Sequence, residues 1–283
     1  MNPLCNASQS LFASALLVAL FTSSAHADGI PEAYHQPAAA CCFSWSGFYY
    51  GGNAGAAWSA SRDITFSGTD TGTNGLGSEI ADGTTPSRAK LDWGTSFTGG
   101  VQAGYNWQLG NLVMGLEADL QWLNAYANFS TVSTNPLRPT ITTSAYREMN
   151  MLATVRARAG IIGWERSMFY LTGGLGVGDA NMRISSSCPN CPDGSGTFPR
   201  DVTSASAGTP TGFVWGVGYE AAFGPRVSVK AEYLHFDLGH NQTTVTYDYS
   251  PNTSTMNGKV HDEGDILCIG VNFKLDRPGE PPK

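Results

Sequence analysis

The sequence predicts an all-β fold: an eight-stranded antiparallel up-and-down transmembrane β-barrel spanning residues 43–275. Three observations predict it. Charged residues make up 14% of the chain, against roughly 25% in soluble domains. Eight segments alternate between apolar and polar residues with a period of two, which is typical of strands with one apolar face. The connections between these segments alternate between long and short, as in outer-membrane barrels.

The composition also excludes several other classes of protein. No run of 18 apolar residues occurs, which excludes a helical membrane protein. Seven Trp, eleven Tyr and thirteen Phe are more than a disordered chain carries. The 16 basic and 23 acidic residues give a net charge of −7, which nucleic acid would repel. We therefore expect no nucleic-acid partner.

The chain begins with the features of a signal peptide. The apolar run Leu11–Phe21 is too short to span a membrane as a helix, and small residues follow it. We expect cleavage between Ala27 and Asp28, which gives a signal peptide over 1–27 and a periplasmic leader over 28–42. No Lys or Arg precedes the apolar run, which departs from the usual positively charged start. The alternative is a buried hydrophobic helix.

Alternation is clearest between residues 92 and 108. Its expected outward face comprises Trp93, Thr95, Phe97, Gly99, Val101, Ala103, Tyr105 and Trp107. The outward faces expected in the other strands are Phe48, Tyr50, Ala54, Ala56 and Trp58; Leu112, Met114, Leu116, Ala118, Leu120 and Trp122; Met149, Met151, Ala153, Val155, Ala157, Ala159 and Ile161; Phe169, Leu171, Leu175 and Val177; Phe213, Trp215, Val217, Tyr219 and Phe223; Val227, Val229, Ala231 and Tyr233; and Leu267, Ile269, Val271, Phe273 and Leu275. A soluble sandwich would also alternate. Aromatic residues at both ends of the apolar face, with small residues between them, favour a lipid-facing wall instead.

The connections have two lengths. The long ones are rich in Thr, Ser, Asn, Gly and Pro and cover residues 60–91, 124–146, 180–210 and 239–261. The short ones cover residues 109–111, 163–167 and 224–225. Structureless loops of about thirty residues are uncommon in compact soluble domains. Long outer loops and short periplasmic turns are usual in outer-membrane barrels. Eight strands then leave both termini, including the tail 276–283, on the periplasmic side.

Full charges occur in the middle of the predicted inward faces. They are Glu117, Asp119, Arg156, Arg158, Glu220, Lys230 and Glu232. An eight-stranded barrel has an interior that side chains just fill, and buried charges must be paired. We therefore expect a lumen filled by salt bridges. The alternative is a narrow, gated, porin-like diffusion channel.

Cysteines and histidines offer few further sites. Cys188 and Cys191 lie in the third long connection, where we expect a local disulfide, because a redox motif would need a βαβ context. Histidines that include His240 and His261 leave open a haem- or ligand-binding receptor that acts through the outer loops. None lies in a recognisable Ser–His–acid setting. We expect no enzymatic activity, no catalytic or metal-binding residues and no cofactor.

Several blocks in order resemble a known family. They are Trp45–Gly55, Gly115–Asp119, Thr154–Arg158, Tyr170–Gly174 and Val229–Leu234. These blocks resemble small alphaproteobacterial outer-membrane β-barrel proteins of the porin-like, opacity-protein-related family. The resemblance covers nearly all of the mature chain. It implies a structural, surface-exposed protein of the Gram-negative outer membrane, in contact with membrane lipids and lipopolysaccharide. The outer loops would meet any host or surface ligands.

The final strand also resembles the signal that the barrel-insertion machinery reads. Gly270, Phe273 and Leu275 fit that signal. Cys268 stands where a polar residue is usual, and the tail 276–283 extends past the strand, where such proteins normally stop at a terminal Phe. The resemblance makes the insertion machinery an expected partner.

Overall fold

The computed structural model describes residues 43–60, 63–73, 75–133, 139–164, 166–192, 197–249 and 251–275. The predicted signal peptide, its cleavage site between Ala27 and Asp28, the leader and the tail 276–283 lie outside the described residues.

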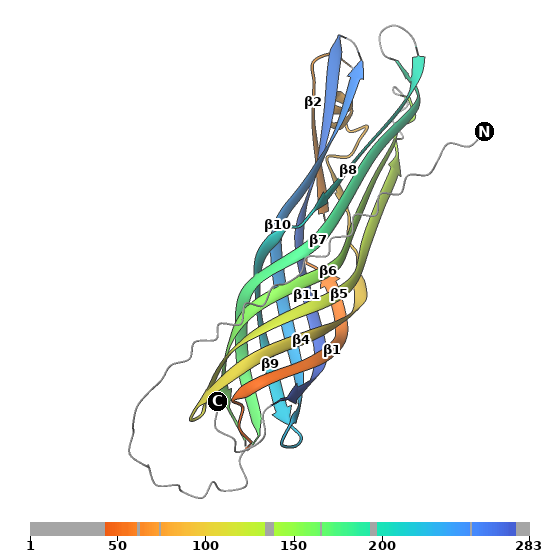
Figure 1. The fold of residues 1–283 in the computed structure, drawn as a ribbon. Helices are drawn as coiled ribbons and strands as arrows, with labels where there is room; N and C mark the ends of the chain where they lie inside the picture. Colours follow the sequence, from red (N-terminus) through yellow and green to blue (C-terminus); the bar gives the residue numbers. More distant parts are fainter. Residues whose placement is uncertain are drawn as a thin grey trace, which may run out of the picture. The chain divides into compact units, whose positions relative to one another are not determined.

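The described residues form eleven strands and one short helix (Figure 1). In chain order they are β1 (Gly47–Ser59), β2 (Asp63–Asp70), α1 (Leu76–Ala81), β3 (Arg88–Lys90), β4 (Thr95–Leu109), β5 (Leu112–Val132), β6 (Thr142–Ile162), β7 (Ser167–Pro192), β8 (Thr197–Gly208), β9 (Thr211–Ala222), β10 (Val227–Tyr249) and β11 (Asn252–Lys274). No helix among them is long and apolar enough to cross a membrane.

Eight of the strands close into an antiparallel ring. Their order is β1-β4-β5-β6-β7-β9-β10-β11, and pairing of β1 with β11 closes it. Neighbours along the ring follow one another in sequence except where β2, β3 and β8 intervene, so the topology is up-and-down. The predicted eight-stranded barrel is confirmed.

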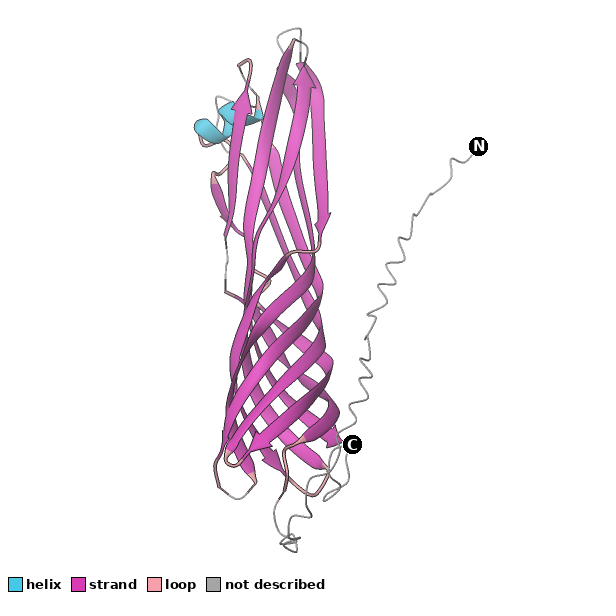
Figure 2. Cartoon of the chain, turned by 60° about the vertical axis from the view of Figure 1, so that its left-hand side comes forward, coloured by secondary structure: helices cyan, strands magenta, loops and turns pink. Residues whose placement is uncertain are grey.

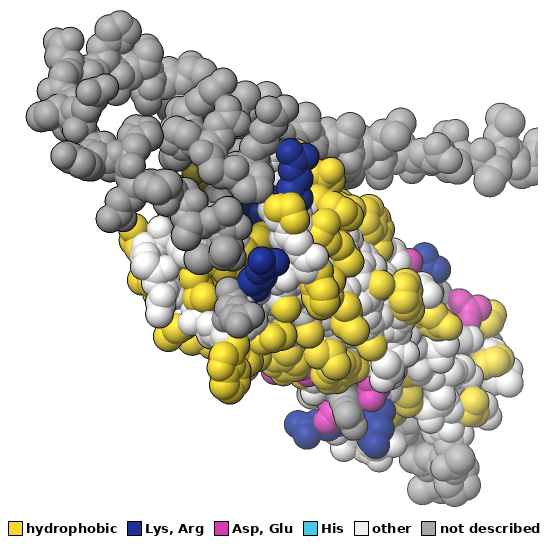
Figure 3. All heavy atoms as spheres, turned by 90° about the horizontal axis from the view of Figure 1, so that it is seen from below, with side chains coloured by type: hydrophobic (Ala, Val, Ile, Leu, Met, Phe, Trp, Pro, Cys, Tyr) yellow, Lys and Arg dark blue, Asp and Glu magenta, His cyan; other side chains and the backbone are white. Residues whose placement is uncertain are grey.

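The two faces of the ring differ as alternation predicts. Phe97, Phe169 and Leu171 on the outward face are 72%, 63% and 65% exposed. Hydrophobic side chains cover the near part of the wall in Figure 3, whereas polar side chains dominate the far part. Aromatic residues stand at both ends of this apolar band. Those at one end include Phe48, Tyr105, Trp107 and Tyr219, and those at the other include Trp58, Trp122, Trp215 and Tyr233.

Most of the predicted long loops are strands, and this part of the prediction is wrong. β5, β6, β7, β10 and β11 each run for 21 to 26 residues and continue well beyond the ring (Figure 2). Their distal halves are rich in Thr and Ser, but they keep the period-two pattern with apolar residues inside, such as Met182, Ile184 and Met256. Thr has high β propensity, so a polar outer face does not prevent strand formation.

Beyond the ring these strands form what we call the extension. β1, β4 and β9 take no part in it, and two sets of paired strands remain: β3-β2-β11-β10 and β8-β7-β6-β5. Figure 1 shows the two sets rising from the ring. One apolar core continues from the distal half of the ring into the extension, and includes Leu234, Phe236, Met182 and Ile64.

Two residues predicted on the outward face point inward. Met149 is fully buried because a β-bulge shifts the register between Met149 and Leu152. Asp179 stabilises the bulge by accepting hydrogen bonds from the backbone N–H groups of Asn150 (2.8 Å) and Met151 (2.6 Å). A bulge places two successive residues against one and so reverses the alternation.

Trp93 is the second residue that departs from its predicted face. It precedes β4, and Gly94, with a φ of 65°, separates it from the strand. A positive φ suits glycine and breaks the extended backbone, so the alternation does not continue back to Trp93. Its ring stacks on Phe236, with 6.4 Å between centroids, inside the apolar core.

Candidate functional site

Arg156 on β6 lies at the centre of the charges inside the ring. Its guanidinium contacts three carboxylates: Glu117 at 2.8 Å, Asp119 at 2.8 Å and Glu232 at 3.2 Å. The β5–β6 register places Glu117 directly opposite Arg156, which explains the contact between them. Glu232 reaches Arg156 from β10 across the lumen.

Arg158 and Lys230 extend the cluster around the lumen. Arg158 pairs with Glu220 on β9 at 2.6 Å and lies 3.5 Å from Glu117. Lys230 on β10 contacts Glu117 at 2.9 Å and Glu232 at 3.3 Å. All seven charged residues predicted for the lumen are therefore in one connected cluster. We call it the ion-pair layer. Asp119 meets Arg156 only through its Oδ2, and its Oδ1 has no partner.

Two tyrosines complete the ion-pair layer. The Tyr49 hydroxyl donates a hydrogen bond to Glu117 at 2.7 Å, and the Tyr170 hydroxyl donates to Glu232 at 2.9 Å. The Arg158 guanidinium lies 4.1 Å from the centre of the Tyr170 ring, within the range of a cation–π contact. Sequence reasoning missed both as members of the network, although alternation assigns each of them to the inward face.

An apolar layer fills the lumen next to the ion-pair layer. Its side chains include Leu152, Val214, Leu234, Phe236 and Ile266, each at most 2% exposed.

A second buried ion pair lies within this apolar layer. Arg147 on β6 pairs with Asp262 on β11, and the Arg147 guanidinium stacks over Trp93 at 4.5 Å. The sequence does not predict this pair, because Arg147 and Asp262 each directly follow a segment that it predicts as a loop, 124–146 and 239–261. The lumen is thus filled by two successive layers of different chemistry.

Helix α1 is held in the extension by side chains from other elements. Its N-cap, Gly75, provides no side-chain cap. The Asp70 carboxylate on β2 caps the helix instead, because it accepts hydrogen bonds from the backbone N–H groups of Gly77 (2.9 Å) and Ser78 (2.6 Å). Leu76 inserts into the apolar core. A helix of six residues has too few internal hydrogen bonds to be stable alone, so these contacts hold it.

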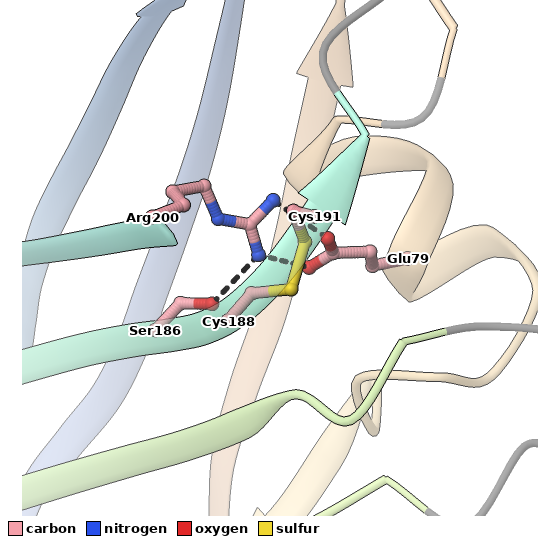
Figure 4. The surroundings of a disulfide bond; sticks show 5 residues. All are labelled: Glu79, Ser186, Cys188, Cys191 and Arg200. Carbon is pink, nitrogen blue, oxygen red and sulfur yellow. Dashed lines mark hydrogen bonds and ion pairs between the residues drawn. A yellow bond between two sulfur atoms is a disulfide. The ribbon is translucent and has the colours of Figure 1, made fainter. Parts of the chain in front are cut away.

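A buried ion pair and a disulfide lie beside α1. Glu79 of α1 pairs with Arg200 of β8 at 2.7 Å, and Arg200 also donates to the Ser186 hydroxyl at 3.1 Å (Figure 4). Cys188 and Cys191 form a disulfide across a bulge in β7, and Cys188 is the register partner of Arg200. Sequence reasoning missed Glu79 and Arg200, because no local pattern links residues 121 positions apart.

Acid should loosen α1 through Asp70. Burial opposes ionisation of Asp70, but hydrogen bonds from Ser254, Ser78 and the Gly77 backbone outweigh it and lower its pKa below 3.8. A lowered folded-state pKa gives stability that is present above the unfolded pKa and is lost as the pH falls through the folded value. We expect hydrogen-exchange protection of α1 to stay constant above about pH 5 and to fall below about pH 4.

The control for this pH dependence is Asp70→Asn. The variant should show weaker protection of α1 at every pH, with no fall below about pH 4. An unchanged acid response in this variant would mean that another group is responsible.

Removing the disulfide should have a local effect. Cys188→Ser removes the disulfide that closes the short loop from Cys188 to Cys191. A covalent loop this short contributes about 2 kcal/mol or less to the free energy of unfolding. We expect faster hydrogen exchange in the distal parts of β7 and β8 and unchanged exchange in β4, which belongs to the ring alone. Faster exchange throughout the ring would contradict a local role.

The three histidines in the described part of the chain, His235, His240 and His261, lie on the outside of the wall. His235 Nδ1 is 2.9 Å from Asp265, and His261 Nε2 is 2.8 Å from Asp237. The rings of His240 and His261 stack with centroids 4.5 Å apart. Among the described residues, no three His, Cys, Asp or Glu side chains are arranged to hold a metal ion.

The residues of the predicted insertion signal lie on or just past β11. Gly270 faces inward, where its register partners are Asn53 and Lys230. Phe273 and Leu275 face outward and are 43% and 63% exposed. Cys268 on the same strand is buried in the lumen.

Comparison with known proteins identifies the family. The model of the outer membrane protein beta-barrel domain matches residues 13–260. The chain belongs to this family. The 31 kDa outer-membrane immunogenic protein of Brucella melitensis is 32% identical over 265 residues, which cover 92% of this chain and 98% of that protein. The 22 kDa outer membrane protein of Rhizobium leguminosarum bv. viciae is 24% identical over 231 residues, which cover 81% of this chain and 79% of that protein.

Solved barrels also resemble the chain, at low identity. Neisserial surface protein A is 16% identical with a TM-score of 0.36, and the match covers 81% of this chain and 98% of that one. OprG from Pseudomonas aeruginosa is 12% identical with a TM-score of 0.41, covering 81% and 97%. The family match, together with the closed ring, makes this chain a surface barrel protein of the Gram-negative outer membrane.

Proposed function

We propose that this protein is a structural barrel with a closed lumen, not a diffusion channel. The observation that carries the proposal is the filling of the lumen by two successive layers. An ion crossing it would have to displace the ion-pair layer, whose charges are already paired. It would then have to enter the apolar layer around Phe236, where an unpaired charge is strongly disfavoured.

We also propose that the protein has no enzymatic activity. The lumen carboxylates support this, because Glu117, Glu220 and Glu232 each contact a buried cation. A carboxylate held in an ion pair is a poor general base, since its charge is already compensated. The extension then serves as a rigid surface that the cell presents to its surroundings.

Export and insertion form a separate part of the proposal. The apolar run at the start of the chain acts as a signal peptide, and the mature protein begins at Asp28. The insertion machinery then reads Gly270, Phe273 and Leu275 on the final strand. Amino-terminal sequencing of protein from purified outer membranes tests the cleavage. A first residue of Asp28 supports it, and an intact Leu11–Phe21 segment overturns it.

Conductance of the refolded protein in a planar bilayer tests the closed lumen. We expect at most small and rare openings under conditions in which a sixteen-stranded porin gives large, steady steps. Steady current on the nanosiemens scale would overturn the proposal and favour the porin-like alternative. Phe236→Ala is a useful second variant for this measurement, because it removes apolar volume from the layer that we propose blocks the passage of ions.

A further inference from the structure

Six outward-facing side chains form a mainly polar surface on the extension, which we call the platform. They come from three adjacent strands: Tyr126 and Asn128 of β5, Tyr146 and Glu148 of β6, and Asn181 and Arg183 of β7. The strand registers align them in two rows. Tyr126, Glu148 and Asn181 form one row, and Asn128, Tyr146 and Arg183 form the other. Tyr126 is 58% exposed and Tyr146 is 38% exposed.

The platform begins where the lipid-facing wall ends. Trp122 is the last aromatic residue of the apolar band on β5, and Tyr126 follows it four residues later on the same outward face. Four residues span about 13 Å along a strand. Bulges between Trp122 and Ala125 and between Met149 and Leu152 mark the transition. The platform is therefore continuous with a surface that already contacts lipid, at the depth of the headgroups.

The chemistry of the platform suits an anionic carbohydrate. Tyrosine presents an apolar ring face on which sugar C–H groups stack, and a polar hydroxyl at its tip. Glu148 is fixed in place by hydrogen bonds from Asn150 Nδ2 (2.7 Å) and from the Tyr146 hydroxyl (3.2 Å). Arg183 is exposed beside Tyr146. Its planar guanidinium matches a carboxylate or a phosphate with two parallel hydrogen bonds.

We propose that the platform binds the anionic core sugars of lipopolysaccharide molecules in the outer leaflet. This inference rests on the orientation in the proposed function, with the extension on the outer side of the membrane. The tyrosines stack on the sugar rings, the amides of Asn128 and Asn181 bond hydroxyl groups, and Arg183 pairs with acidic groups of the core. The bound glycolipid thereby fixes the height of the barrel in the membrane.

The test compares two glycolipids on the full-length refolded protein in detergent micelles. One is lipopolysaccharide with a complete core and no outer polysaccharide, and the other is lipid A without core sugars. We expect the wild type to bind the core-bearing form at least about tenfold more tightly. The double variant Tyr126→Ala/Tyr146→Ala and the single variant Arg183→Ala should lose most of this preference. Lys259→Ala provides a control, because Lys259 is an exposed cation on β11, in the other set of strands of the extension.

The possible outcomes separate the alternatives. Equal binding of the two glycolipids by the wild type, or an unchanged preference in the platform variants, overturns the proposal. Loss of self-association in the variants without loss of glycolipid preference assigns the platform to a second copy of the chain and also overturns it. Heat-modifiable migration on a gel verifies that each variant has folded. The result is independent of conductance, so failure of the closed-lumen proposal is distinguishable from failure of this one.

Discussion

Replacing Arg156 by alanine is expected to lower the free energy of unfolding by about 3–5 kcal/mol, the usual cost of breaking a buried ion pair. The reason is that Glu117, Asp119 and Glu232 all contact this one guanidinium. Its removal leaves three carboxylates in the lumen with Lys230 and Arg158 as the nearby cations. Urea unfolding in lipid vesicles measures the loss.

Val155→Ala is the matched control for this variant. Val155 is the preceding residue and lies on the outward face, 61% exposed. Losing its methyl groups should cost about 1 kcal/mol or less. If the two variants are equally stable, the ion-pair layer contributes nothing to stability and its role must be sought elsewhere.

An arginine placed on the lipid face should have the second-largest effect. Val155→Arg puts a charge against the hydrocarbon, which costs about 2–4 kcal/mol at the middle of the bilayer and little near its surface. Val132→Arg provides the control, because Val132 is 53% exposed on the same strand set but lies in the extension. The same unfolding assay should find Val132→Arg close to neutral. Equal costs for Val155→Arg and Val132→Arg would show that our assignment of the membrane to the level of Val155 is wrong.

The ring and its inward charges follow directly from the sequence because both depend on one local regularity. Alternation continues without interruption from Leu112 to Trp122 and from Met151 to Ile161, so each charged residue falls on a definite face. Two neighbouring strands that face one lumen then bring opposite charges together. Tyr49 and Tyr170 obey the same rule, but the predicted network rests on full charges alone, and a neutral hydroxyl on the inward face does not by itself require a charged partner.

The extension could not be predicted from the sequence for two main physical reasons. Its strands are rich in Thr and Ser, so their composition resembles that of a loop, and only the spacing of apolar residues such as Met182 and Ile184 indicates a core. Its contacts also depend on distant pairing. The strand β2 pairs with β11 and Glu79 meets Arg200, and neither contact leaves a local trace. Bulges add a further difficulty, because one inserted residue turned Met149 inward.

The central claim is that successive residues of a ring strand point alternately to the lipid and to a packed lumen. Fluorescence quenching by quenchers attached to the lipid tests this claim most directly. Leu171 is 65% exposed and Thr172 is 7% exposed on β7. A fluorophore on Leu171→Cys should be quenched strongly by nitroxide groups on the acyl chains. Thr172→Cys should resist labelling in the folded barrel, and any fluorophore attached there should be quenched weakly. Equal, strong quenching at both positions would contradict the assignment of faces and the filled lumen with it.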